Sequence, residues 1–294
     1  MYIKPAVRRR MAPYLFISIF FIAYGVFGFY PTLYGLWLSF QGGIDHFTFV
    51  GFKHYIEVFH DALFWQSMWN GTKMALASLL IITPLAMGVA ILINQRRIAK
   101  YKGFFATFFF TPNITSAVAV GVIFSLIFDP SVGMLNRLIG LFGLPSVQWL
   151  QDPHWTMPSL VIVIIWRALG INILYCLAGL QNVSQDLGEA AKIDGANSFQ
   201  SFWHITLPAM RPVMAFIVFQ AILGSYNMFT EAFVLAGKGF GPADSLVFPT
   251  TYLYQQAFQA ENYGYSAAVG WVFTLILVII GIVQLKFFRL REEN

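Results

Sequence analysis

The sequence predicts an all-α polytopic membrane protein with six transmembrane helices. Of its 294 residues, 58% are hydrophobic and only 11% are charged, which is more apolar than a soluble domain with one core needs. Several apolar runs approach the roughly 20 residues that a helix needs to cross a bilayer. These runs lack the strict alternation of a transmembrane β-barrel, and lipid admits only helices or closed barrels.

The expected spans follow the apolar runs, at residues 13–40, 71–94, 104–128, 157–180, 212–236 and 263–285. The first run follows Arg8, Arg9 and Arg10, as in a secretory signal, but it is too long and no small-residue cleavage site follows it. We therefore expect an amino-terminal segment at 1–12, a retained first helix at 13–40 and a core of five helices within 71–288. Pro84 and Pro112 interrupt the second and third spans, where we expect kinks.

Basic residues predict the orientation of these spans. Only four of the 18 Lys and Arg lie in the loops or span ends of one side, namely Lys53, Lys73, Arg137 and Lys238, while Arg167 lies within a span. The others lie on the opposite side, at the termini and in the loops after the second and fourth spans. The positive-inside rule therefore places both termini and the loop at 181–211 in the cytoplasm. Because the net charge of +5 collects at span ends, it indicates topology and no nucleic-acid partner.

Other residue types exclude further sites. The one cysteine, Cys176, permits no internal disulfide. The five histidines are scattered over loops without the spacing of metal ligands, so no metal site is expected. On the outer side, Asp129, Trp149 and Asp152 are candidates for contact with a partner protein.

The loop at 181–211 is polar and predicts two short helices. Ser184 can cap a helix over about 185–194, with Asp186 in its first turn, and Gly195 permits a turn. Asn197 or Ser198 can cap a second helix. The residues expected to share one side of that helix are Phe199, Phe202, Trp203 and Leu207. Taken alone, the loop is either an amphipathic connector on the lipid surface or a docking element for a cytoplasmic partner.

Several segments resemble a known family. Glu189-Ala190-Ala191, Gly195 and Ile205-x-Leu207-Pro208 have the types and spacing of the EAA loop in membrane subunits of binding-protein-dependent ABC importers. "GFKHYIEVF", "DPSVGMLNRLIGLFGLP" and "YQQAFQAENYGYSAAVGWVF" look like the sugar-permease branch of that family. The chain is similar to the first of the two paired permeases in maltose- and glycerol-phosphate-type systems.

The resemblance implies a type I (MetI-like) ABC importer permease fold in a bacterial or archaeal inner membrane. It implies a second, different permease, two copies of a cytoplasmic ATPase, an extracytoplasmic solute-binding protein and a carbohydrate-type solute. It also implies that the loop at 181–211 couples to the ATPase, and that Glu189 pairs there with a basic residue. The expected coupling residues are Glu189, Ala190, Ala191, Gly195, Phe202, Ile205, Leu207 and Pro208.

No ATP-binding motif is present in this chain. The sequence lacks G-x-x-x-x-G-K-[ST], so we expect ATP and magnesium to bind the partner ATPase and no cofactor to bind here. "GKGFGP", at 237–242, is rich in glycine but has the wrong spacing. We expect a turn at this segment.

Polar residues inside spans are costly and mark a cavity or a helix contact. Gln220, Gly224, Asn227 and Glu231 recur on one side of the fifth helix. They form either a wall for a hydroxyl-rich solute, with Tyr226 or another aromatic residue stacking on sugar faces, or hydrogen bonds between helices. Arg167 in the fourth span either pairs with Glu231 or attracts an anionic group. With positions that the resemblance adds, the candidates for the substrate path are Arg167, Gly170, Asn172, Gln220, Ser225, Asn227, Met228 and Glu231.

Two other classes of function compete. An ion-coupled secondary carrier would use Arg167 and Glu231 as relay residues and would have inverted repeats with broken helices, which the sequence does not reveal. A membrane-embedded enzyme would need a cluster of catalytic groups, and none is apparent. Both alternatives leave the loop around Glu189 unexplained.

Overall fold

The computed structural model describes residues 14, 17–43, 47–95, 98–237 and 239–289. The chain divides into two compact units, which are considered separately. Unit 1 comprises Met1–His60 and Leu253–Val272, and unit 2 comprises Asp61–Tyr252 and Phe273–Asn294, within those described residues.

The described residues contain five candidate spans, or the predicted six if one bent pair of helices is counted as a single span. Five helices are long and apolar enough to cross a membrane: Ile17–Leu38, Ala62–Asn94, Pro153–Gln181, Arg211–Leu235 and Tyr263–Phe288. The sixth span is a pair of helices, α6 (Lys102–Ile114) and α7 (Ala117–Ile127), which meet at an angle of 89°. A continuous third span at 104–128 is therefore a wrong prediction. Pro112 lies in the last turn of α6, so the kink expected near Pro112 is a bend of 89° between two separate helices.

Unit 1 joins two of the segments that carry the family resemblance. In this unit, His54 Nε2 lies 3.0 Å from the carbonyl oxygen of Gln41. A Cβ on Gly264 would overlap the same carbonyl, so only glycine fits there. The elements are η1 (Gly25–Phe29), α2 (Tyr30–Leu38), β1 (Gln41–Gly42) antiparallel to β2 (Thr48–Phe49), α3 (Lys53–His60), and parts of α15 (Pro249–Phe258) and α16 (Tyr263–Arg289).

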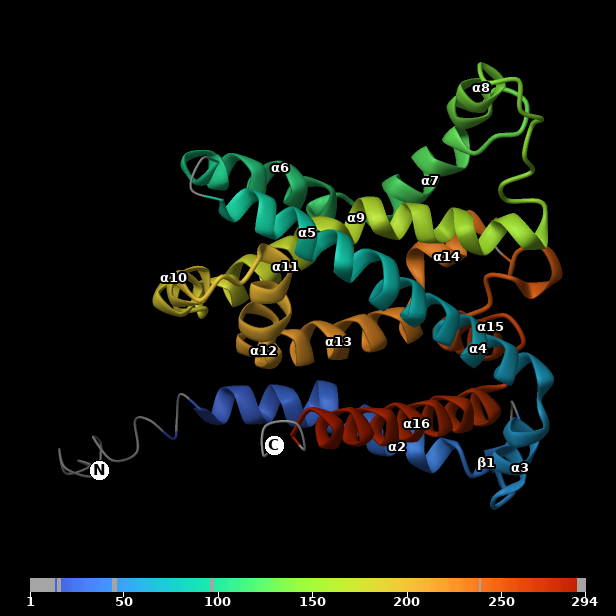
Figure 1. The fold of residues 1–294 in the computed structure, drawn as a ribbon. Helices are drawn as coiled ribbons and strands as arrows, with labels where there is room; N and C mark the ends of the chain where they lie inside the picture. Colours follow the sequence, from blue (N-terminus) through green and yellow to red (C-terminus); the bar gives the residue numbers. More distant parts are fainter. Residues whose placement is uncertain (1–13, 15–16, 44–46, 96–97, 238, 290–294) are drawn as a thin grey trace, which may run out of the picture. The chain divides into compact units, whose positions relative to one another are not determined.

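Unit 2 is built around the long helix α9 (Pro153–Gln181), against which α5, α6 and α13 pack. Figure 1 shows α10 and α11 at one end of this unit and α8 at the other. The remaining elements are α4 (Ala62–Ala77), η2 (Ser78–Ile82), α5 (Thr83–Asn94), η3 (Ala99–Tyr101), α8 (Met134–Gly140), α10 (Gln185–Ile193), α11 (Ser198–Ser201), η4 (Phe202–Thr206), α12 (Leu207–Ala209), α13 (Arg211–Tyr226), α14 (Thr230–Leu235) and η5 (Pro242–Asp244).

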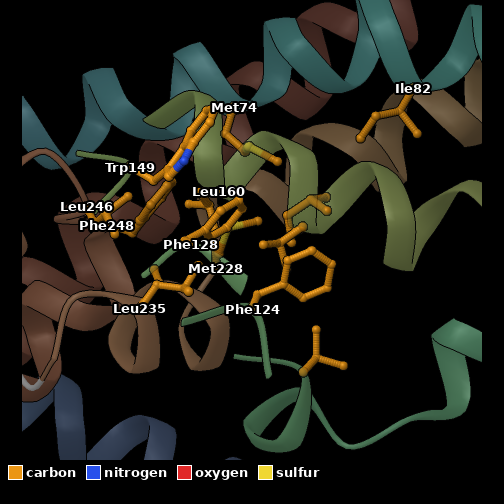
Figure 2. Packing of buried hydrophobic residues seen from close by; sticks show 14 residues of the cluster. Met74, Ile82, Phe124, Phe128, Trp149, Leu160, Met228, Leu235, Leu246 and Phe248 are labelled. Atoms are coloured by element: carbon orange, nitrogen blue, oxygen red, sulfur yellow. The ribbon is translucent and has the colours of Figure 1, made fainter. Parts of the chain in front are cut away.

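Two apolar clusters pack against different stretches of α9. Figure 2 shows the first, which contains Leu160 of α9, Phe124 of α7, Phe128 directly after α7, and Trp149. The ring of Phe128 lies 5.7 Å from that of Phe124 and 5.9 Å from that of Trp149. The second cluster contains Ile173, Cys176 and Leu177 of α9 with Ala86, Met87, Ala90, Ile93, Met210 and Ile217. Between the two clusters, α9 carries Arg167 and Asn172.

The outer-side candidates Asp129, Asp152 and Trp149 have structural roles in unit 2. Asp129 accepts hydrogen bonds from the backbone N–H groups of Val132 and Ser131, and these lower the pKa of its carboxyl. Asp152 caps α9 by accepting from the backbone N–H of His154 at 2.8 Å. Trp149 is buried, and its indole N–H donates to Asn136. These contacts give all three residues a structural role within unit 2.

Gly170 lets α9 and α6 approach closely. It is buried, and a Cβ at this position would overlap the backbone carbonyl of Phe109 in α6. Backbone atoms cannot move aside as a flexible side chain can. The close helix contact therefore requires glycine, in the manner of small residues at membrane helix interfaces.

Gly170→Ala should destabilise unit 2, because the added methyl group forces α6 and α9 apart. Overpacking of this kind typically costs about 1–3 kcal/mol. Thermal unfolding of the detergent-purified protein should show a lower midpoint for Gly170→Ala. Gly88→Ala in α5 is the matched control, since a Cβ there meets no atom within 4 Å. Equal midpoints for both variants would contradict the assignment of Gly170 to the helix contact.

Candidate functional site

Unit 2 contains a cavity of about 410 Å³ at the level where α9 carries Arg167 and Asn172. The second, third, fourth and fifth spans all contribute to its wall. Most of the polar side chains in this wall are uncharged, and they belong to Ser78, Thr83, Asn113, Asn172, Tyr175, Gln220, Ser225, Asn227 and Thr230. Such a wall can both donate and accept hydrogen bonds.

Three spans depart from regular α-helix where they line this cavity. The second span is π-helical at η2, and Ser78 and Ile82 of this segment face the cavity. In the third span, α6 ends at Ile114, directly after Asn113, which also lines the cavity. The fifth span is interrupted between α13 and α14, at 227–229. Irregular backbone is tolerated at membrane depth where protein buries it or where it lines a cavity, and π-segments are frequent at functional sites.

The predicted stripe of the fifth span does face the cavity, although the helix that carries it is not continuous. Gln220 and Gly224 belong to α13, Asn227 lies in the interruption and Glu231 lies in α14, and all four line the wall. Ser225 and Met228, which the resemblance added, line it as well, and so do Arg167 and Asn172 of α9. The structure thus gathers these expected path residues around one space.

Two of the expected positions do not lie in the cavity wall. Gly170 faces the backbone of α6 instead. Tyr226 is buried against α4, with its hydroxyl 2.8 Å from Thr72 Oγ1. Tyr175 of α9 lines the cavity instead, and its ring meets Phe216 edge-on at 5.0 Å.

Arg167 and Glu231 form an ion pair in the cavity wall. The Glu231 side chain is 9% exposed and the Arg167 side chain 27%. A carboxylate so deeply buried needs a positive partner, because an unpaired buried charge is strongly destabilising. The Nε–H of Arg167 is also buried and has no protein acceptor among the described residues. Of the two roles considered for Arg167, the structure shows the pairing with Glu231.

Several wall residues were not among the predicted candidates. Asn113, Tyr175 and Thr230 are polar residues inside apolar spans, the same signal that identified Gln220 and Asn172. Ser78 and Thr83 are weaker cases, since a hydroxyl on a helix often bonds to its own backbone, as Thr83 does to the carbonyl of Ser78.

The loop at 181–211 folds as predicted in its first half. α10 spans Gln185–Ile193, and Gly195 has a φ of 84°, in the left-handed region that favours glycine. Asn197 caps α11 through a reciprocal capping box with Gln200, in which both hydrogen bonds measure 2.8 Å. These contacts fix the direction in which the second helix leaves the turn.

The second half of the loop differs from the prediction of one shared aromatic face. The π-segment η4 (Phe202–Thr206) changes the helical period, so Phe202 packs on the apolar cluster around Ile173 while Phe199 and Trp203 stay exposed. The ring of Trp203 contacts the rings of both Phe199 and Phe202.

The expected coupling residues occupy different environments. Glu189, Ala190 and Gly195 are exposed, Ala191 is buried, and Phe202, Ile205, Leu207 and Pro208 are partly buried. Glu189 lines a second cavity, of about 950 Å³, between this loop and the ends of α5 and α9. Four large apolar side chains of the loop are exposed, namely Leu187, Ile193, Phe199 and Trp203, and we call them its exposed apolar side chains. Leu187 and Ile193 were not predicted.

The glycine-rich segment at 237–242 is a turn, as expected. Gly237 and Gly241 have φ values of 64° and 75°. Asn70 Nδ2 donates to the carbonyl of Asp244, just beyond the segment, at 3.2 Å and thereby ties it to α4. No group of three His, Cys, Asp or Glu that could hold a metal ion occurs among the described residues.

Comparison with known proteins gives consistent similarities. Residues 82–291 match the family described as "Binding-protein-dependent transport system inner membrane component". The arabinooligosaccharides transport system permease protein AraP of Halalkalibacterium halodurans is 36% identical over 94% of this chain and 87% of the relative. The lactose transport system permease protein LacF of Rhizobium radiobacter is 31% identical over 96% and 94%.

A solved structure has the same fold. It is a bacterial ABC transporter involved in the import of the acidic polysaccharide alginate, with a TM-score of 0.84 over 97% of both chains. At 24% identity, this similarity speaks for the fold alone.

Asn197→Ala should loosen the start of α11, because it removes one half of the capping box. Loss of such a cap costs about 1 kcal/mol, so amide hydrogen exchange over 200–206 should become several-fold faster. Asn182→Ala, in the same loop but at the carboxyl end of α9, is the control and should leave exchange at 200–206 unchanged. Equal exchange in wild type and Asn197→Ala would show that the cap does not hold this helix.

Proposed function

Because the chain belongs to the family of inner membrane components of binding-protein-dependent transport systems, we propose that it is a permease subunit of an ATP-driven ABC importer for a carbohydrate or sugar-derived solute. Relatives named for arabinooligosaccharides and lactose support the class of solute. The observation that carries the proposal within this chain is the polar cavity in which interruptions of three spans meet.

The cavity suits a solute with many hydroxyl groups. Its volume of about 410 Å³ lies within the roughly 300–1,000 Å³ range of small-molecule sites. Asn172 and Asn227 each donate one hydrogen bond to a backbone carbonyl at 2.9 Å. Their amides and that of Gln220 have further capacity to donate and accept, which matches the two roles of a sugar hydroxyl. The apolar wall residues Ile164, Ile171 and Met228 fit the less polar faces of sugar rings.

The loop at 181–211 is proposed to bind the ATPase that drives the cycle. Its exposed apolar side chains are the aromatic and aliphatic anchors typical of protein interfaces, and its helices could dock in a groove on a partner. ATP and magnesium bind that partner, two copies of which close on ATP. Glu189 and Ala190 are also exposed in this loop, so that Glu189 can pair with a basic residue of the ATPase.

The proposed orientation places both termini and this loop in the cytoplasm. Figure 1 shows the connection between α5 and α6 at the same end of unit 2 as α10. This connection carries Lys100 and Lys102, in agreement with the distribution of basic residues. A solute-binding protein would deliver cargo from the opposite side, and a second, different permease would complete the pore.

The ion-coupled carrier is the weaker alternative. The structure does contain interrupted helices, which such a carrier was expected to have, so their supposed absence no longer argues against it. The family match decides in favour of the importer. Arg167 and Glu231, the expected relay residues, neutralise each other.

The source of energy can be tested in proteoliposomes that contain the complete complex, its binding protein and labelled solute. We expect uptake to require ATP on the cytoplasmic side and to persist when an ionophore abolishes ion gradients. Uptake that stops with the ionophore while ATP is present would identify a carrier.

Gly195→Ala should uncouple the loop from transport. Alanine at this left-handed position costs roughly 1–2 kcal/mol and favours another angle between α10 and α11. Solute-stimulated ATP hydrolysis and uptake by the assembled complex should both fall about tenfold, the effect of ~1.4 kcal/mol on a rate. Gly51→Ala strains a comparable left-handed turn outside the loop and is the control. Equal losses in the two variants would contradict a coupling role for Gly195.

A further inference from the structure

We propose that the Arg167–Glu231 ion pair makes this chain's wall of the cavity electrically neutral, so that the cavity accepts neutral carbohydrates and rejects those that carry carboxylates. The inference rests on the proposed function, and it narrows the class of solute. It concerns two residues that the sequence left with either of two roles.

The composition of the wall is the first observation. Among the described residues that line the cavity, Arg167 and Glu231 are the only charged side chains. The others are amides, hydroxyls or apolar groups. Since the two charges cancel in direct contact, the wall offers a bound solute hydrogen bonds but no net charge.

The location of the pair is the second observation. Arg167 comes from the middle of α9 and Glu231 from the first turn of α14, directly after the interruption of the fifth span. Glu231 is nearly buried, so its charge is poorly screened by water. Arg167 is therefore not a vacant site for an anion, because a carboxylate of the protein already occupies it.

A sugar acid would meet two obstacles in this cavity. Its carboxylate would leave water without gaining a free cation, and buried charges need a partner. It would also gain no net attraction from the wall, because the charge of Arg167 is already cancelled by Glu231. A neutral sugar of the same shape meets neither obstacle, because Asn172, Gln220 and Asn227 bind hydroxyls without any charge.

The test compares two pairs of disaccharides, whose members differ by two carboxylates in the first pair and by one in the second. These are galactobiose with digalacturonate, and cellobiose with cellobiouronate. Equilibrium dialysis measures their binding to the purified complete importer at pH 7 without its binding protein, so that only the membrane site contributes. We expect wild type to bind the neutral member of at least one pair about tenfold or more tightly than the acid.

Charge variants then separate selectivity from a purely structural role. Glu231→Gln leaves a lone guanidinium, so relative affinity for the acid should rise at least about tenfold. Arg167→Gln leaves a lone carboxylate, so the acid should bind more weakly than in wild type. The double variant Arg167→Gln/Glu231→Gln is neutral again and should regain the wild-type preference. A pair that only held the helices together would weaken the neutral and acidic sugars equally in all variants.

The outcomes distinguish this inference from the function on which it rests. Wild type that binds the acids as tightly as the neutral sugars, or an acid-to-neutral ratio that is unchanged by Glu231→Gln, would overturn the charge-based selectivity alone. Wild type that binds none of the four sugars at millimolar concentration would overturn both this inference and the assignment of the cavity to a carbohydrate. The preference for neutral sugars, with the predicted order among the variants, would support both.

Discussion

Hydrocarbon cannot hydrogen-bond to the backbone, and this constraint organises unit 2. Every N–H and C=O group at membrane depth must be satisfied within the protein, so a helix can be interrupted only where protein or a polar cavity surrounds the break. The π-segment η2, the turn between α6 and α7 and the interruption between α13 and α14 all adjoin the same cavity. The irregular backbone and the polar wall therefore occur together, because a polar cavity is a place where backbone at membrane depth can depart from a helix.

The two apolar clusters keep this polar region in place. The first cluster, around Leu160, holds α7 and α14 to one stretch of α9, and the second, around Ile173, holds α5 and α13 to another. Cores of this kind are close-packed and yield little. The cavity lies between them on α9, and the ion pair of Arg167 with Glu231 spans it from α9 to α14. Along about two turns of α9, the surroundings thus change from a close-packed apolar cluster to a polar cavity that contains an ion pair.

The sequence was most informative where a local rule suffices. Apolar runs located six spans, the φ requirement located the turn at Gly195, and the cost of buried charge suggested that Arg167 pairs with Glu231. The sequence did not predict features that depend on contacts between helices. Gly170 was expected in the cavity, but it faces α6, because only the fold shows which side of α9 that helix covers. Pro112 indicated a kink but not a turn of 89°, and no residue type announces the π-segment that directs Phe202 inward.

Two helices, α9 and α13, connect the loop to the cavity. The loop joins the end of α9 to the start of α13, and both helices line the cavity farther along, at Asn172 and Gln220. These ends are firmly packed on each other, since a Cβ on Gly179 would come within 2.7 Å of Met210 and 3.2 Å of Val213. A force on the loop would therefore move α9 and α13 together. The fifth span is interrupted at 227–229, between the loop and Glu231, and beyond this break Glu231 ties α14 back to α9. The ion pair in the wall therefore links α9 to the part of the fifth span that lies beyond its interruption.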